Sequence, residues 1–136
     1  MGRIIAIANQ KGGVGKTTTA INLSACLAES GQKVLTVDFD PQGNATSGLG
    51  IEKGEIDKTV YDLLVGECDI EECLISNMQE NLDLLPSNVD LAGAEIELLE
   101  IENKEALLKT YLSKIQNNYD FIIIDCPPSL NLLTIN

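Results

Sequence analysis

The chain contains no histidine, and only four of its 136 residues are cysteines. None of these four, Cys26, Cys68, Cys73 and Cys126, belongs to a C-x-x-C pair. Structural zinc sites are built from such pairs or from cysteine together with histidine, so the sequence offers no zinc set. We therefore expect the cysteines to be reduced thiols of an intracellular protein.

Long apolar runs and basic residues are also scarce. No stretch of 18 apolar residues occurs, which excludes a membrane-spanning helix, and the first residues show no signal-peptide pattern, so we expect a cytoplasmic protein. Nine basic residues stand against 21 acidic ones, for a net charge of −12. This balance argues against a nucleic-acid-binding surface on this segment. Five glutamates between positions 95 and 105 indicate a solvated helix face or a docking patch for a basic partner.

What the chain does have is a regular alternation of short apolar runs with helical patterns. We expect strands at 4–8, 33–38, 82–85 and 121–125, and helices at 16–29, 59–65, 70–76, 87–101 and 108–115. Strands that are apolar on both faces are typical of parallel sheets covered by helices. The pattern predicts an α/β fold, a mostly parallel sheet flanked by helices, with residues 1–136 belonging to a single domain.

A glycine-rich loop follows the first predicted strand and opens the first predicted helix. It reads Lys11, Gly12, Gly13, Val14, Gly15, Lys16, Thr17, Thr18. Glycines allow several backbone N–H groups to point at one phosphate, and the helix adds its positive N-terminal end. In such a loop Lys16 reaches the β- and γ-phosphates and the Thr17 hydroxyl binds Mg²⁺. Gln10 replaces the first glycine of the usual pattern, and a chance glycine-rich turn is the alternative.

Aspartates follow two further strands. Asp38 and Asp40 come at the end of the second strand, where a parallel sheet delivers side chains to its ligand crevice. ATP hydrolysis needs a carboxylate that orients water toward the γ-phosphate. A simple Asp-Pro turn that ends the strand is the other interpretation. Asp125 ends the apolar strand at 121–125, a position typical of a second Mg²⁺ contact.

With these motifs in order, the chain resembles the ParA/Soj family of chromosome and plasmid partitioning ATPases. Residues 9–18 resemble the deviant Walker A box of that family, and residues 37–47 its Walker A′ box. Residues 91–95 resemble a further family segment, and residues 125–130 resemble the Walker B motif and the switch after it. The similarity runs through all 136 residues.

The resemblance implies a role for each motif residue. Lys11 would be the signature lysine that reaches the ATP of a partner subunit across a sandwich homodimer. Thr17 would bind Mg²⁺ and Asp125 would hold it through water, with Asp38 supporting the metal shell. The remaining expectations are that Thr18 contacts the α-phosphate and that Asp40 positions the attacking water.

The resemblance also implies cofactors and partners. ATP or ADP and Mg²⁺ would bind at the loop, and a ParB-type protein would stimulate hydrolysis. Members of the family run to about twice this length, so we expect a P-loop ATPase domain truncated after the Walker B strand. The other half would carry the surface that binds DNA without sequence preference and associates with the nucleoid. We expect no membrane partner.

Three alternatives remain open. The 136 residues could be a phosphate- or nucleotide-binding fragment without turnover. A division-site ATPase of the MinD type would share the loop and attach to the membrane through a C-terminal amphipathic helix. An iron–sulfur carrier would need cysteines that bridge a cluster, and the spacings give it no support.

Overall fold

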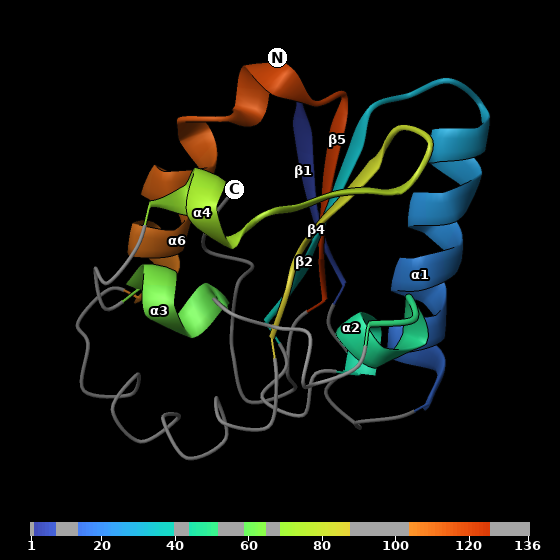
Figure 1. Ribbon diagram of the computed structural model, residues 1–136, viewed down its shortest axis with the longest axis horizontal. Helices are drawn as coiled ribbons and strands as arrows, with labels where there is room; N and C mark the ends of the chain where they lie inside the picture. The colour runs from blue at the N-terminus through green and yellow to red at the C-terminus, as the bar shows by residue number, and fades with distance from the viewer. Residues whose placement is uncertain are drawn as a thin grey trace.

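Three of the segments predicted as strands form the centre of the sheet. In β2 (Val34–Asp38), β4 (Leu82–Leu85) and β5 (Phe121–Asp125), every residue except Phe121 is buried. Strands buried on both faces need helices above and below the sheet. The computed structural model of the protein has this arrangement (Figure 1), and it describes residues 2–7, 14–39, 44–51, 59–64, 69–87 and 104–125.

The sheet has five strands in the order β1-β5-β2-β4-β3. β1 (Arg3–Ile7) runs parallel to β5, and β5, β2 and β4 are parallel to one another. β3 (Ile75–Gln79) is antiparallel to β4 at the outer edge. Because four strands point the same way, their carboxyl ends meet at one edge of the sheet, the lower edge in Figure 1.

Helices cover both faces of this sheet. α1 (Val14–Glu29) and α2 (Asn44–Gly48) lie on one face, to the right in Figure 1. α3 (Val60–Leu64), α4 (Ile70–Cys73) and α6 (Lys104–Ser113) lie on the other. The predicted fold class is therefore confirmed: a mostly parallel sheet flanked by helices, of the P-loop NTPase type.

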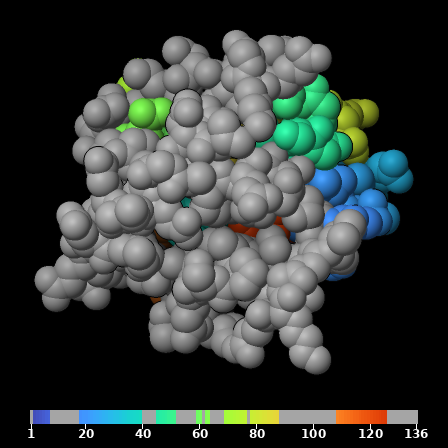
Figure 2. Space-filling model, turned by 90° about the horizontal axis from the view of Figure 1, so that it is seen from below, coloured from blue at the N-terminus to red at the C-terminus, as the bar shows by residue number. Residues whose placement is uncertain are grey.

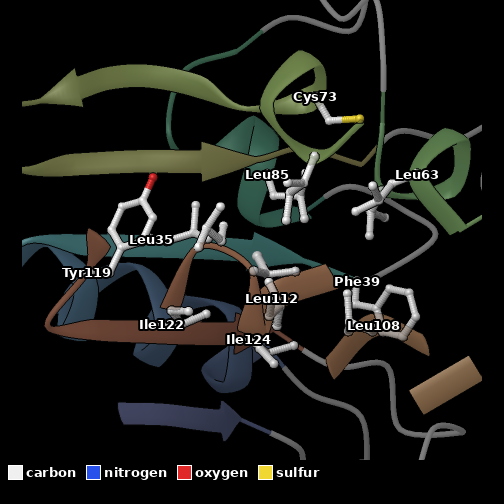
Figure 3. Close-up of a cluster of buried hydrophobic side chains, with 14 residues drawn as sticks. Leu35, Phe39, Leu63, Cys73, Leu85, Leu108, Leu112, Tyr119, Ile122 and Ile124 are labelled. Carbon is white, nitrogen blue, oxygen red and sulfur yellow. The ribbon is translucent and has the colours of Figure 1, made fainter. Parts of the chain in front are cut away.

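The two faces have different cores. The face under α3, α4 and α6 holds the larger apolar cluster, which Figure 3 shows, with Leu108 and Leu112 of α6 packed over Leu35, Ile122 and Ile124 of the sheet. The face under α1 holds a smaller cluster that includes Ala20, Ala28 and Ile123. Alanine on the buried face of α1 lets the helix axis approach the strands closely. α1 is therefore held close to the strands it covers.

The end of α1 follows from one glycine. Gly31 has φ +93°, a left-handed conformation that suits glycine. Its N–H donates to the Ala28 carbonyl at 3.1 Å, and the Gln32 N–H donates to the Leu27 carbonyl at 3.1 Å. These are the two hydrogen bonds of a Schellman cap, so the helix end predicted at residue 29 is confirmed.

The prediction of a helix at 70–76 is wrong after Cys73. α4 ends there and β3 begins at Ile75, where it forms a hairpin with β4. Asn81, in the turn, has φ +68°, which asparagine tolerates better than most residues. A five-residue strand of this kind is stabilised by the neighbouring strand, and periodicity within a short window cannot detect that neighbour.

The expectation of reduced cysteines is also wrong at Cys73. Cys73 is buried and disulfide-bonded, whereas Cys26 on α1 is an exposed free thiol. The other half of the bridge lies outside the described residues. Disulfide pairing depends on the distance between residues in the fold, which the spacing of cysteines along the chain does not reveal.

Some predicted elements lie outside the described residues: most of the helix at 87–101, with its glutamate cluster, and the Asp-Pro turn after Asp40. The described part of the chain contains no helix that is long and apolar enough to cross a membrane.

Candidate functional site

Two buried aspartates lie side by side at the carboxyl edge of the sheet. Asp38 ends β2, Asp125 ends β5, and the two are direct register partners. Ile7, the last residue of β1, pairs with Asp125 on the other side. Partners on adjacent strands point to the same face of a sheet, and Ile7 packs in the cluster under α1, so both carboxylates are on the α1 face. Each is 0% exposed.

The N-terminal end of α1 is at this same edge. β1 ends at Ile7 and α1 begins at Val14, so only six residues connect the strand to the helix. The first turn of a helix has N–H groups without intrahelical partners and carries a partial positive charge. Figure 2 views this edge of the molecule, with α2 and part of α1 on one side and part of β5 visible near the middle. A ligand with negative charge would therefore find donors here.

A hydrogen-bond network ties Asp38 to two other segments. Asp38 Oδ2 accepts from the Thr46 N–H at 2.8 Å and from Thr46 Oγ1 at 2.6 Å. Thr46 Oγ1 in turn accepts from the Ser87 N–H at 3.0 Å. Thr46 is the third residue of α2, and Ser87 lies two residues beyond the end of β4. All three residues are buried, so the network joins the ends of two strands and a helix without water between them.

A second buried hydroxyl pair sets the position of α1. Thr36 Oγ1 donates to Ser24 Oγ at 2.8 Å, from β2 to the middle of the helix. Thr36 and Asp38 are two residues apart on one strand and therefore share a face. The helix α1, whose N-terminal end lies at the candidate site, is thus hydrogen-bonded to β2, the strand that carries Asp38.

α2 packs closely on α1. A Cβ on Gly48 would come within 2.4 Å of Ile21 Cδ1, so the side chain of Ile21 occupies the space that the glycine leaves. Ala45 and Thr46 of α2 are fully or almost fully buried. The helix after the second strand is therefore held on two sides, by α1 and by Asp38.

The structure describes some of the predicted site residues and not others. Asp38 and Asp125 are brought together, and residues 14–18 form the first turns of α1, where Thr18 has an exposed side chain. Lys11, Gly12, Gly13 and Asp40 lie outside the described residues. The side chains of residues 14–17 are also outside the description. The roles assigned to all of these residues stay predictions.

Sequence reasoning missed Thr46 and Ser87 as members of the site. Thr46 stands inside the block that resembles the Walker A′ box, but nothing in the local pattern says that its hydroxyl turns back onto Asp38. One signal could have found it. A threonine two residues into a helix is well placed to bond with a carboxylate that caps that helix.

The donor set fits Mg²⁺ bound with phosphate better than a closed metal cage. Mg²⁺ is commonly held by one or two carboxylates together with water and substrate phosphates. The edge offers two buried carboxylates beside a helix N-terminus. Across the segments that the structure describes, no three His, Cys, Asp or Glu side chains gather to hold a metal by themselves.

Comparison with known proteins agrees with this geometry. A family described as "AAA domain" matches residues 2–136. The sporulation initiation inhibitor protein Soj of Bacillus subtilis is 60% identical over 136 residues, which are 100% of this chain and 54% of that protein. The chromosome-partitioning ATPase Soj of Treponema pallidum is 52% identical, over 100% of this chain and 53% of that protein. The chain thus spans about half the length of the curated relatives it matches.

A solved structure is also similar to this chain, and the match again covers about half of the longer protein. Cobyrinic acid a,c-diamide synthase from Mycobacterium smegmatis, crystallised with an ATP analogue and magnesium, superposes with a TM-score of 0.88. It is 46% identical, and the match covers 100% of this chain and 55% of that one. Taken with the paired aspartates at the N-terminus of α1, these similarities show that the chain belongs to the AAA domain family and is a homologue of the Soj and ParA chromosome-partitioning ATPases.

Proposed function

We propose that this chain is the nucleotide-binding part of a Mg²⁺-dependent ATPase that acts in chromosome or plasmid partition. The observation that carries the proposal is the pairing of Asp38 with Asp125 at the edge where α1 begins. The 60% identity to Soj supports the biological role. Since the relatives are about twice as long, we propose that residues 1–136 are the N-terminal part of a single P-loop ATPase domain.

The loop at residues 11–18 binds the phosphates of ATP or ADP in this proposal. Backbone N–H groups of Gly12, Gly13, Val14 and Gly15 surround the phosphate chain, and the start of α1 adds positive potential. Lys16 neutralises the β- and γ-phosphates, which stabilises the charge that builds up in the transition state. Support comes from a solved homologue that was crystallised with an ATP analogue.

The residues that would hold Mg²⁺ are Thr17, Asp125 and Asp38. When bound, Mg²⁺ neutralises charge on the β- and γ-phosphate oxygens. Thr17 would supply a hydroxyl ligand, and Asp125 would hold the ion through water. Asp38 would lie beside this shell, with its Oδ2 held by the N–H and the hydroxyl of Thr46.

Asp40 and Lys11 complete the proposed chemistry. Asp40 accepts a hydrogen bond from the attacking water and aligns it with the γ-phosphate. Lys11 extends to the nucleotide of a second copy of the protein, so that hydrolysis requires an ATP-sandwich homodimer. A ParB-type protein stimulates turnover, and DNA binds without sequence preference through residues beyond position 136. The protein acts in the cytoplasm, on the nucleoid, without a membrane partner.

The Mycobacterium smegmatis structure raises a second candidate function, the ATP-dependent synthesis of a cobyrinic acid diamide. Its identity to this chain is 46%, against 60% for Soj, so partition is favoured. The two functions differ in what stimulates ATP turnover. DNA and a ParB-type partner should stimulate a partition ATPase, whereas cobyrinic acid should stimulate a diamide synthase.

The test is ATP turnover by the full-length protein with Mg²⁺, with and without DNA and partner. Lys16→Ala should abolish turnover, and Asp40→Ala should lower kcat by about 100-fold or more, because the water loses its orienting carboxylate. Asp83→Asn, at the opposite end of the sheet, is the control and should hydrolyse normally. An Asp40→Ala protein that hydrolyses at the wild-type rate would remove the role we assign to Asp40. Calorimetry of the 136-residue chain with ATP and Mg²⁺ tests whether it binds nucleotide without turnover.

A further inference from the structure

The hydrogen bonds around Thr46 run in one direction. The Ser87 N–H can only donate, so the Thr46 hydroxyl oxygen accepts from it at 3.0 Å, and the hydroxyl proton is directed to Asp38 Oδ2, 2.6 Å away. The Thr46 N–H also can only donate, and it lies 2.8 Å from the same carboxylate oxygen. Asp38 Oδ2 therefore accepts two hydrogen bonds from one residue, and the Ser87 amide sets the direction of one of them.

These two bonds fix the orientation of the Asp38 carboxylate. The main chain of Asp38 is already held, because this residue pairs with Asp125 of β5 and because the next N–H, that of Phe39, donates to the Asp125 carbonyl at 3.0 Å. The carboxylate could still turn about its side-chain bonds. Such a turn would break both bonds to Thr46, and both residues are shielded from water that could replace them, with Asp38 0% and Thr46 1% exposed.

We propose that Thr46 is a positioning residue for the Mg²⁺ site: it holds the Asp38 carboxylate in the orientation that the metal shell requires, and the Ser87 amide holds Thr46. This inference rests on the proposed ATPase function and on the role of Asp38 in it. Thr46 contacts neither metal nor nucleotide in this proposal. Mg²⁺ demands a nearly ideal octahedral shell, so the orientation of the groups around it matters more than for most ions.

The test is metal binding by the full-length protein with ADP, with Mn²⁺ as a paramagnetic probe of the same oxygen ligands. Thr46→Val keeps the shape and the N–H of the residue but removes the hydroxyl. We expect its Mn²⁺ affinity, titrated by electron paramagnetic resonance, to fall by about 10- to 100-fold, as is typical when a metal site loses an orienting partner. Thr46→Ser, which restores the hydroxyl, should return the affinity to near the wild-type value.

Affinity for ADP without metal, measured in EDTA, should be the same in Thr46→Val and wild type. A merely structural role would not separate Mn²⁺ affinity from ADP affinity in this way. The proposal is overturned if Thr46→Val binds Mn²⁺ as tightly as wild type, if Thr46→Ser is as weak as Thr46→Val, or if ADP affinity in EDTA falls equally.

Tyr119→Phe is the matched control. It removes a buried hydroxyl that also donates to a carboxylate at 2.6 Å, on Asp83 at the opposite end of the sheet. We expect it to lower stability and to leave Mn²⁺ affinity unchanged. An equal loss of Mn²⁺ affinity in Tyr119→Phe would mean that any buried hydroxyl of the sheet has this effect, and the specific role of Thr46 would be wrong.

A measurement on the wild-type protein needs no variant to fold. If Thr46 links Asp38 with Ser87, hydrogen exchange of the Ser87 amide should be slower with ADP and Mg²⁺ than with ADP alone, because a held carboxylate holds its partners. The reference is the buried Val34 amide at the amino edge, which donates to the Asn81 carbonyl at 2.8 Å and should exchange equally in both conditions. Equal exchange at Ser87 contradicts the proposal.

The wild-type protein also separates failure of this inference from failure of the proposed function. A wild-type protein that neither binds Mn²⁺ with ADP nor hydrolyses ATP refutes the proposed function. A wild-type protein that does both, beside a Thr46→Val variant with unchanged Mn²⁺ affinity, refutes the role of Thr46 alone.

Discussion

Two buried carboxylates on neighbouring strands each accept a hydroxyl hydrogen bond of 2.6 Å. Asp38 accepts it from Thr46 at the carboxyl edge of the sheet, and Asp83 accepts it from Tyr119 at the amino edge. They also lie on opposite faces, since Asp38 faces α1 and Tyr119 belongs to the larger core. Figure 3 shows Tyr119 in that core, with its hydroxyl directed toward β4. The chemistry of the two bonds is nearly the same.

The two bonds differ in the elements that they connect. Tyr119 connects the start of β5 with the start of β4, and both are parts of the apolar core. Thr46 connects the end of β2 with α2 and with the chain after β4, at the edge of the candidate site. Ligands of parallel α/β sheets bind outside the carboxyl ends of the strands. The same kind of bond therefore belongs to the apolar core at one edge and to the candidate site at the other.

The largest effect should come from removing the two charges in turn. Asp38→Asn keeps an oxygen that can accept from Thr46, so the fold is retained while the negative charge beside the proposed metal shell is lost. We expect ATP turnover to fall by about 100-fold. Asp83→Asn makes the same chemical change at the amino edge and should leave turnover within about twofold of wild type. Equal losses in steady-state kinetics of the two variants would break the comparison.

The next effect is the loss of stability when a methyl group is added at the amino edge or at the carboxyl edge of the sheet. A Cβ on Gly2 would lie 2.4 Å from the Tyr119 carbonyl oxygen, and a Cβ on Gly48 would lie 2.4 Å from Ile21 Cδ1. The first obstacle is main chain and the second is the end of a flexible side chain. We expect Gly2→Ala to cost about 2–3 kcal/mol in free energy of unfolding, and Gly48→Ala about 1 kcal/mol or less.

Urea unfolding of the two alanine variants measures the difference. The main chain at Gly2 has little room to move, because its N–H donates to the Gln116 carbonyl at 3.0 Å and its carbonyl accepts from the Gln116 side chain. If Gly48→Ala proves the more destabilising, the packing of α2 on α1 is more rigid than the amino edge.

The smallest effect is a pH dependence confined to the amino edge. Burial, and then the hydrogen bond and negative charge of Asp83, raise the pKa of the Tyr119 phenol above its usual value. The unfolded state loses this proton near pH ~10 while the folded state keeps it. The contribution is therefore complete below pH ~10 and is lost as the pH rises toward the higher pKa of the folded protein.

Unfolding free energies measured on either side of pH ~10 check this sign. Wild type should lose stability as the pH rises, and Tyr119→Phe should lose less. At neutral pH the phenylalanine variant should be less stable by about 1–2 kcal/mol, because Asp83 loses a buried donor. Parallel pH profiles for the two proteins would mean that the phenol pKa is unchanged by folding.

The strands and helices with strong local signals could be predicted from the sequence. Residues 34–38, 82–85 and 121–125 are apolar runs whose burial needs no knowledge of their neighbours, and Gly31 marks the end of α1 by its own conformational freedom. β3 could not be predicted, because its five residues become a strand only beside β4. The disulfide at Cys73 was missed for a related reason, since it depends on a partner elsewhere in the fold.

The same distinction between local patterns and long-range contacts applies to the candidate site. The glycine-rich loop and the aspartates at strand ends are local patterns, so the sequence alone predicts which residues would meet a phosphate and determines which strands carry the carboxylates. Only the tertiary structure decided that β5 lies between β1 and β2, which makes Asp125 the neighbour of Asp38. It also decided that Thr46 bonds with Ser87, 41 residues away in the chain. Local sequence determines which backbone conformations have low free energy. Strand order and long-range hydrogen bonds depend instead on how the whole chain buries its apolar surface.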